Sequence, residues 1–203
     1  MLFRSDEWGG WYDVEPNTNG GFLYQQNTMR DAILAAATLN IFHKHAERVK
    51  MANIAQIVNV LQAVILTKDE KLILTPTYHV MEMFNVHQDA TNLPLEIRTN
   101  DYVLGKEKLP AVSLSASKDK AGLIHISLAN IDMNKPQEVS INIKGNLAKT
   151  LTGRILNADK VQDFNSFENP NKIKPNVFTG AKLTANELKI TLPPASVVVL
   201  EMK

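Results

Sequence analysis

The hydrophobic pattern changes its period near residues 92–94. Before this point apolar residues recur at the three- and four-residue spacings of helices, and after it they alternate with polar residues in short runs separated by Gly, Pro and Asn. A helix buries every third or fourth side chain, whereas a strand with one buried face buries every second one. The sequence therefore predicts an α+β protein with two structural units, residues 1–92 and residues 93–203.

The first unit is expected to contain two helices. Thr28 and Asp31 have the spacing of a capping box, which predicts a helix from this point to about Glu47. Its residues 33–42 are almost entirely apolar, so we expect neighbouring elements to cover most of its surface. A second, short helix is predicted over residues 78–88. Residues 49–66 carry a polar residue at every third position, which fits neither period, and we expect a strand followed by a loop or a helix there.

The second unit has the pattern of an antiparallel β-sandwich of the jelly-roll kind. Half-buried strands are predicted where apolar and polar residues alternate, and a further strand is predicted in a β-branched run; the segments are residues 112–116, 124–128, 139–143, 188–192 and 197–199. Residues 118–122 contain a glycine and predict a hairpin connection. Short strands at this density are typical of sandwiches.

Composition narrows the partners of the chain. The 203 residues hold 22 Lys plus Arg against 21 Asp plus Glu, without a dense cationic run, which argues against a nucleic-acid partner. Cysteine is absent, so disulfides and thiolate metal sites are excluded while a cytoplasmic, periplasmic or secreted location stays compatible. The longest apolar stretch is interrupted by five polar residues, and we predict no membrane segment. A neutral small molecule fits this composition best.

Residues 5–12, with the sequence SDEWGGWY, are the most unusual segment. They place two carboxylates beside two tryptophans and a tyrosine. A carboxylate can act as nucleophile or acid on a glycoside, and an indole can cover the apolar face of a sugar ring. The same residues can equally form a strand end with core tryptophans and solvated acids, which is the commoner outcome for such a composition. Composition leaves both interpretations open.

A longer run of motifs resembles the α-L-arabinofuranosidases of glycoside hydrolase family 51. The similarity is dense over about the first ninety residues and continues more loosely to the C-terminus. It rests on Asp6-Glu7-Trp8-Gly9, Trp11-Tyr12-Asp13, and residues 22–26 (FLYQQ), 29–32 (MRDA), 39–42 (LNIF), 48–56 (RVKMANIAQ), 58–62 (VNVLQ) and 75–80 (TPTYHV). Many segments agree in order and spacing, which makes the resemblance specific.

The resemblance implies the last two βα units of a (β/α)8 barrel in residues 1–92, followed by a C-terminal β-sandwich in residues 93–203. Active sites in such barrels lie at the C-terminal ends of the strands. By motif position, Glu7 would be the nucleophile, Trp11 would line the sugar subsite, and Gln56 would hydrogen-bond the arabinose hydroxyls. The substrate class implied is an arabinose-containing oligo- or polysaccharide, such as arabinan or arabinoxylan, and no cofactor is required.

The implied mechanism is double displacement, which needs a second carboxylic acid about 5–5.5 Å from the nucleophile. In the family this acid belongs to an Asn-Glu pair upstream of the nucleophile, and Asn186-Glu187 is the one such pair in this sequence. We interpret that pair as a hairpin tip in the sandwich. The isolated chain is therefore expected to be inactive. The alternative is a non-catalytic sandwich that braces a barrel or binds carbohydrate; Phe164, Phe167 and Phe178 are its late aromatics, and phenylalanines favour bracing.

Further expectations concern the remaining polar residues. The five histidines are expected to be solvated or at the core edge, and we predict no metal site because no His-Glu-x-x-His pattern occurs. Among Asn53, Gln56, Asn59 and Gln62, only Gln56 is expected to bind ligand, and the others to satisfy buried backbone groups.

The sequence differs from the family pattern at two places, and one predicted helix has an apolar surface. Gly10 stands where family members carry a side chain. Phe3–Ser5 is less apolar than a barrel strand, so we expect the first strand to be poorly formed. The apolar helix predicts self-association, as a homo-oligomer or with a covering partner.

Overall fold

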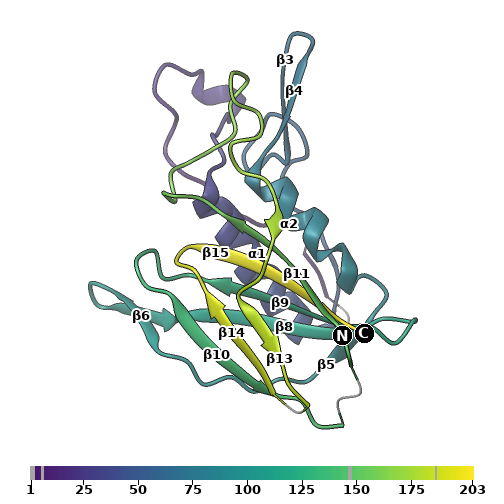
Figure 1. The fold of residues 1–203 in the computed structure, drawn as a ribbon. Helices are drawn as coiled ribbons and strands as arrows, with labels where there is room; N and C mark the ends of the chain where they lie inside the picture. The colour runs from purple at the N-terminus through teal and green to yellow at the C-terminus, as the bar shows by residue number, and fades with distance from the viewer. Residues whose placement is uncertain (1–2, 6, 146–147, 186) are drawn as a thin grey trace.

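The computed structural model describes residues 3–5, 7–145, 148–185 and 187–203, with the backbone alone for residues 3–5. Two antiparallel sheets form its lower half, and two helices lie across the upper face of the larger sheet (Figure 1). The six-stranded sheet has the order β12-β11-β15-β9-β8-β5, and the three-stranded sheet the order β10-β14-β13. The chain is thus rich in sheet, with few helices and a sandwich-like pair of sheets.

The sandwich has strands at the predicted segments. The bounds in the larger sheet are β5 Thr91–Leu93, β8 Val112–Lys118, β9 Ile124–Asn130, β11 Leu151–Asn157, β12 Asn176–Val177 and β15 Ser196–Met202. Those in the smaller sheet are β10 Gln137–Asn142, β13 Ala181–Leu183 and β14 Glu187–Leu192. Two hairpin strands, β6 Asp101–Leu104 and β7 Glu107–Pro110, project from one end. All five predicted strand segments are confirmed, and the predicted hairpin joins β8 to β9.

The first ninety residues hold the helices and a parallel pair of strands. The elements are β1 Phe3–Ser5, η1 Gly20–Phe22, α1 Met29–Lys44, β2 Val49–Ala52, β3 Ile65–Lys68, β4 Lys71–Leu74, α2 Pro76–Phe84 and η2 Asn85–His87. β1 pairs in parallel with β2, and α1 connects them, so the chain begins with a βαβ arrangement. The first strand is short, with three residues, and its pairing with β2 has a register irregularity between Phe3 and Arg4, in keeping with the expectation of a poorly formed strand. The proposed unit boundary after residue 92 falls inside β5.

Both predicted helices are confirmed. The carboxylate of Asp31 accepts the backbone N–H of Thr28 at 2.8 Å, which satisfies a donor at the start of α1. Turns continue from the end of α1 to residue 48, close to the predicted end at Glu47. Residues 49–66 resolve into β2, an irregular loop and the start of β3. Within the described residues, neither helix is long and apolar enough to cross a membrane.

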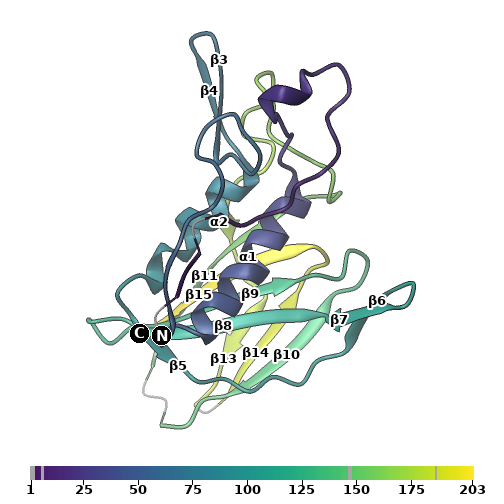
Figure 2. The ribbon, with the colours of Figure 1, turned by 180° about the vertical axis from the view of Figure 1, so that it is seen from behind.

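Helix α1 packs on the larger sheet beside α2 (Figure 2). Its buried face includes Met29, Ala32 and Ala36, which pack with Val197 and Val199 of β15. The opposite face of the same sheet packs against the smaller sheet through a second core, centred on Leu128, Leu188 and other side chains. Both faces of the larger sheet are therefore covered, and the odd and even residues of β15 serve different cores.

The serines of β8 and β9 line the interface between the sheet and α1. We predicted half-buried strands, but Ser115, Ser117 and Ser127 are 5% exposed or less. The half-buried prediction was wrong because α1 and η2 cover this face with polar side chains that pair with the serines. The side-chain Oδ1 of Asn40 accepts the hydroxyls of Ser115 at 2.8 Å and Ser127 at 2.7 Å.

Histidines extend this buried polar layer. His43 Nδ1 lies 2.9 Å from Ser115 Oγ, and His87 Nδ1 lies 2.8 Å from Ser117 Oγ. The two rings are 4.6 Å apart. Burial lowers the pKa of His43 to about 4, and burial together with the neighbouring imidazoles lowers the pKa of His87 to about 3. Both rings are consequently neutral in the folded protein at neutral pH.

Stability should fall as the pH drops from 6.5 towards 4. The unfolded chain binds protons at both histidines below its ordinary pKa of 6.5, whereas the folded chain does not, so each histidine removes about 2 kcal/mol of unfolding free energy between pH 7.5 and pH 5. Urea unfolding at the two pH values measures this loss. His87→Gln, which retains a hydrogen-bonding side chain beside Ser117, should remove about half of it. His45→Gln, at an exposed site, is the control, and an unchanged pH dependence in His87→Gln would contradict the prediction.

Candidate functional site

The loop that follows β1 carries the candidate nucleophile and both tryptophans. Glu7 is exposed, and Trp11 is 69% exposed. Trp8 is half-buried, and its ring packs edge-on against Phe42 of α1 with centroids 5.6 Å apart. Asp6 of the predicted motif lies outside the described residues. One tryptophan thus anchors the loop to the helix, and the other is available to a ligand.

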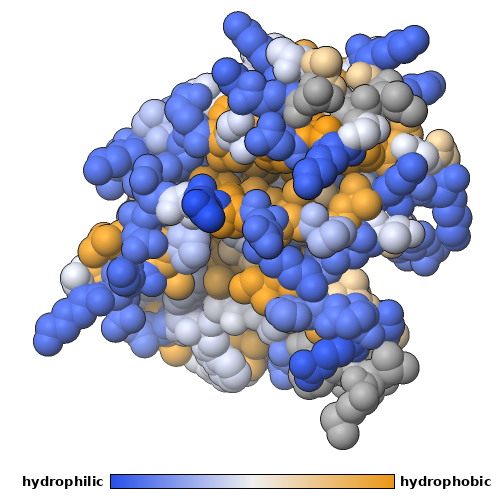
Figure 3. All heavy atoms as spheres, turned by 90° about the horizontal axis from the view of Figure 1, so that it is seen from below, coloured by the Kyte–Doolittle hydropathy of each residue, from blue (hydrophilic) through white to orange (hydrophobic). Residues whose placement is uncertain are grey.

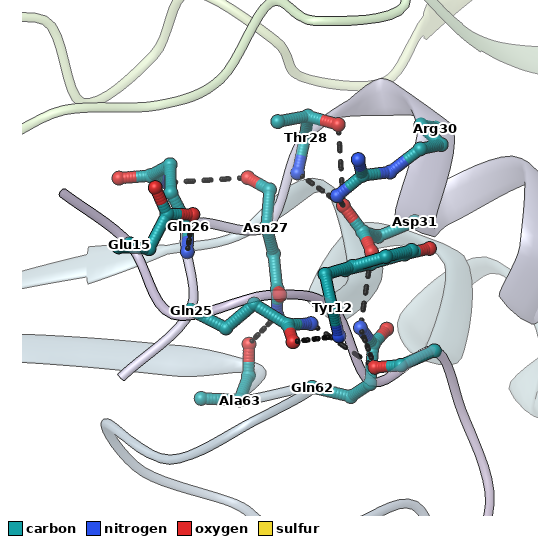
Figure 4. Close-up of polar contacts among 11 residues, drawn as sticks. Tyr12, Glu15, Gln25, Gln26, Asn27, Thr28, Arg30, Asp31, Gln62 and Ala63 are labelled. Atoms are coloured by element: carbon teal, nitrogen blue, oxygen red, sulfur yellow. Dashed lines mark hydrogen bonds and ion pairs between the residues drawn. The ribbon is translucent and has the colours of Figure 1, made fainter. Parts of the chain in front are cut away.

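Two glutamines fix the middle of this loop (Figure 4). The carbonyl oxygen of Gly10 accepts Gln25 Nε2 at 3.1 Å and Gln62 Nε2 at 2.9 Å. The N–H of Tyr12 donates to Gln25 Oε1 at 3.0 Å. The backbone on either side of Trp11 is therefore hydrogen-bonded to side chains from two other segments.

Asp31 lies behind the loop with a fully buried carboxylate. Its Oδ1 accepts Gln62 Nε2 at 3.0 Å, and its Oδ2 lies 3.3 Å from the guanidinium of Arg30. That guanidinium also stacks on the ring of Tyr12, 3.6 Å from the centroid. Burial and the charge of Asp31 raise the pKa of Tyr12, so the phenol is neutral at physiological pH.

The loop after β2 carries Gln56 and lies directly beside the loop after β1. The N–H of Ala55 donates to the carbonyl oxygen of Trp8 at 3.5 Å. The N–H of Gln62 donates to the carbonyl oxygen of Ala55 at 2.9 Å, which closes the second loop on itself. The side chain of Gln56 is exposed. The backbone thus brings together the segments of Glu7 and Gln56, at the C-terminal ends of two adjacent parallel strands.

Three hollows are relevant to a ligand. An open one of about 700 Å³ is lined by Trp11, Tyr12 and Arg30, among others, and a narrow one of about 20 Å³ is lined by Trp11, Tyr12 and Gln25, among others. Neither is lined by Glu7 or Gln56. A cavity of about 550 Å³ lies instead in the sandwich, between residues 93–98 and β10. Viewed from below, apolar surface lies in a hollow bordered by hydrophilic side chains (Figure 3).

The late phenylalanines and the Asn-Glu pair lie away from the two loops and mostly make packing or strand contacts. Phe178 packs in the core between the sheets, and Phe167 packs against the small cluster around Leu66, while Phe164 is 40% exposed. Glu187 begins β14 and accepts the hydroxyl of Ser140 at 2.7 Å, and its neighbour Asn186 lies outside the described residues. Among the described residues, no group of three His, Asp or Glu side chains is arranged to hold a metal ion.

The sequence missed two members of the network around Gly10. Gln25 was noticed only within the FLYQQ motif, and Asp31 only as a helix cap. Gln62 was expected to satisfy a buried backbone group, and its bond to the Gly10 carbonyl confirms this. The burial of Asp31 could not be read from its capping position, because a carboxylate at a helix N-terminus can equally face solvent.

Residues 6–196 match the sequence profile of the α-L-arabinofuranosidase C-terminal domain. The chain belongs to this family. An intracellular exo-α-L-arabinofuranosidase of Bacteroides ovatus is 52% identical over 199 residues, which are 98% of this chain and 39% of the relative. The resemblance to glycoside hydrolase family 51 is confirmed.

Solved structures of family members have the same fold. The crystal structure of the GH51 arabinofuranosidase from Xanthomonas axonopodis pv. citri superposes with a TM-score of 0.97 at 44% identity, and covers all of this chain and 41% of that one. The arabinose complex of the Thermotoga maritima α-L-arabinofuranosidase has a TM-score of 0.83 at 27% identity, over 97% of this chain and 42% of that one. The chain therefore spans about two fifths of the length of these relatives.

Replacing Gly9 with alanine should disrupt the loop of this family member. Gly9 has φ +129, and an added Cβ would overlap Gln62 Cγ. The strain and the overlap should lower the free energy of unfolding by at least about 3 kcal/mol. Gly105→Ala is the matched control, because Gly105 has φ +62 with no atom within 4 Å and should cost only about 1 kcal/mol. Chemical denaturation of the two variants measures the difference, and equal losses would contradict the tight approach at Gly9.

Proposed function

We propose that this chain provides the nucleophile side of a retaining α-L-arabinofuranosidase that removes terminal α-L-arabinofuranosyl residues from arabinan- or arabinoxylan-type glycans. Glu7 is the nucleophile, Trp11 lines the sugar subsite, and Gln56 hydrogen-bonds the arabinose hydroxyls. The observation that carries the proposal is the backbone hydrogen bond from Ala55 to Trp8, because it places the segments of Glu7 and Gln56 next to each other. The names of the relatives in the family support the same activity.

The chemistry assigned to Glu7 is nucleophilic attack on the anomeric carbon. The carboxylate forms a covalent arabinosyl ester as the glycosidic oxygen leaves, and water then cleaves the ester with net retention. Glu7 is exposed and lies outside the buried carboxylate network of Asp31, so its oxygens are available to a ligand. The acid/base that protonates the leaving oxygen is assigned to no residue of this chain. Glu187, the glutamate of the Asn-Glu pair, lies in the sandwich and accepts the hydroxyl of Ser140.

The architecture that fits this role is a barrel edge joined to a sandwich. We assign residues 1–92 to the last two βα units of a (β/α)8 barrel and residues 93–203 to the sandwich. The parallel pairing of β1 with β2 through α1 supports the assignment, since parallel strands joined by a helix are the repeating unit of such barrels. Packing of α1 on β8, β9 and β15 would then fix the barrel edge to the sandwich.

A chimera tests the nucleophile. In it, this chain replaces the matched 39% of the Bacteroides ovatus enzyme, and the substrate is 4-nitrophenyl α-L-arabinofuranoside. The chimera should release 4-nitrophenol, and Glu7→Ala should lower kcat at least about 10³-fold because the covalent intermediate is lost. Azide should restore turnover in Glu7→Ala by replacing the missing carboxylate.

Two controls complete this experiment. Glu47→Ala removes an exposed carboxylate near the end of α1 and should leave kcat unchanged. The isolated chain should release 4-nitrophenol about 10²–10⁴-fold more slowly than the chimera, because it lacks general acid catalysis. Full activity in Glu7→Ala, or robust turnover by the isolated chain, would contradict the assignment.

We also propose that the exposed apolar side of α1 associates with a second copy or a covering partner. Leu34 and Ile41 are 37% and 54% exposed, and their spacing of seven residues puts them on one face of the helix. Light scattering should therefore give a mass above 22.6 kDa. Leu34→Gln combined with Ile41→Gln should reduce the mass, whereas Leu104→Gln on the β6–β7 hairpin should not. A clean monomer of the unmodified chain would count against the proposal.

A further inference from the structure

Gln62 occupies an unusual position between the two loops of the candidate site. Its side chain is 2% exposed, and its single carboxamide nitrogen donates to both Gly10 O and Asp31 Oδ1. The two N–H groups of one amide are thereby fully used. The side chain consequently bridges the backbone of the Glu7 loop and a buried charge at the start of α1 (Figure 4).

We propose that Gln62 is a positioning residue of the proposed sugar site: it holds the loop bearing Glu7 and Trp11 in register with the loop bearing Gln56. This inference rests on the proposed function. Gln62 contacts no substrate in this role. It acts through Gly10, which lies three residues after Glu7 and immediately before Trp11.

The backbone of Gln62 makes the connection rigid. Its N–H donates to the carbonyl oxygen of Ala55, the residue before Gln56. Ala55 in turn donates to the carbonyl oxygen of Trp8. Two hydrogen-bonded connections therefore join the Gln56 loop to the Glu7 loop. One is the backbone bond from Ala55 to Trp8, and the other is the bond from the amide of Gln62 to Gly10. Two attachment points prevent rotation of the loop about either one.

Asp31 anchors the amide. Its carboxylate is held by the N–H of Thr28 and lies at the N-terminus of α1, where the helix dipole favours negative charge. Hydrogen bonds to a charged acceptor are stronger than those between neutral groups. Gly10 is thus connected through Gln62 and Asp31 to α1, which is itself packed on the larger sheet.

A packing role and a positioning role predict different results for Gln62→Glu. The substitution preserves the size and shape of the side chain but replaces two N–H donors with at most one O–H donor, and it places a second carboxyl group beside Asp31. A residue that only fills space would tolerate the change better than truncation. A residue that holds Gly10 by donation would not.

The first measurement uses the 203-residue chain and follows amide hydrogen exchange by NMR. In Gln62→Glu the N–H of Tyr12, which is protected by Gln25, should exchange at least about tenfold faster, because the loop opens more often. Amides of β8 and β9 should be unchanged, which shows that the sandwich remains folded. Gln88→Glu, with the same charge change at an exposed site, is the control. Unchanged protection of Tyr12 in Gln62→Glu would overturn the proposal.

The second measurement uses the chimera with 4-nitrophenyl α-L-arabinofuranoside. Displacement of a reacting group by about 1 Å can cost about 10²-fold in rate. Gln62→Glu should therefore lower kcat at least about tenfold at a temperature where the protein is folded, with a smaller change in KM. Unchanged kcat in an active chimera would overturn the positioning role. An inactive unmodified chimera would instead contradict the proposed function, while the exchange measurement still decides whether Gln62 holds the loop.

Discussion

The buried carboxylate of Asp31 joins the fold of this protein to its candidate site. One oxygen accepts the N–H of Thr28 and starts α1, and the other accepts the amide of Gln62. A buried charge without partners would cost several kcal/mol, so each of these donors is required once the carboxylate is covered. The helix that packs on the sandwich and the loops that carry Glu7 and Gln56 are therefore fixed by the same group.

The second constraint is the covering of both faces of the six-stranded sheet. β15 is apolar on both sides, and it separates the core between the sheets from the core beneath α1. β8 and β9 instead present serines to the helices, where Asn40, His43 and His87 hydrogen-bond them. The resulting polar layer is uncharged at neutral pH, which makes the attachment of the helices to the sheet sensitive to acid. This polar layer lies at the C-terminal end of α1, whereas Asp31 and the candidate site lie at its N-terminal end.

Much of the fold could be predicted because it is encoded locally. The alternation in residues 112–116 and 124–128 predicts strands whatever covers them, and the Thr28–Asp31 spacing predicts the start of α1. The covering itself was missed, because a serine facing water and a serine facing Asn40 give the same sequence pattern. The partners lie about 75 and 87 residues apart along the chain. Likewise, the bond from Gln62 to Gly10 spans 52 residues and follows from no period. The family resemblance supplied the proposed roles of Glu7, Trp11 and Gln56, which composition left open.

The central claim is that Glu7 attacks the anomeric carbon of an arabinofuranoside, and covalent labelling tests it most directly. An arabinofuranoside with fluorine at C2 and an activated leaving group slows hydrolysis of the ester intermediate and traps it on the nucleophile. After incubation with the chimera, peptide mass spectrometry should locate the added sugar on Glu7. A sugar adduct on any other carboxylate, with Glu7 unmodified, would contradict the account.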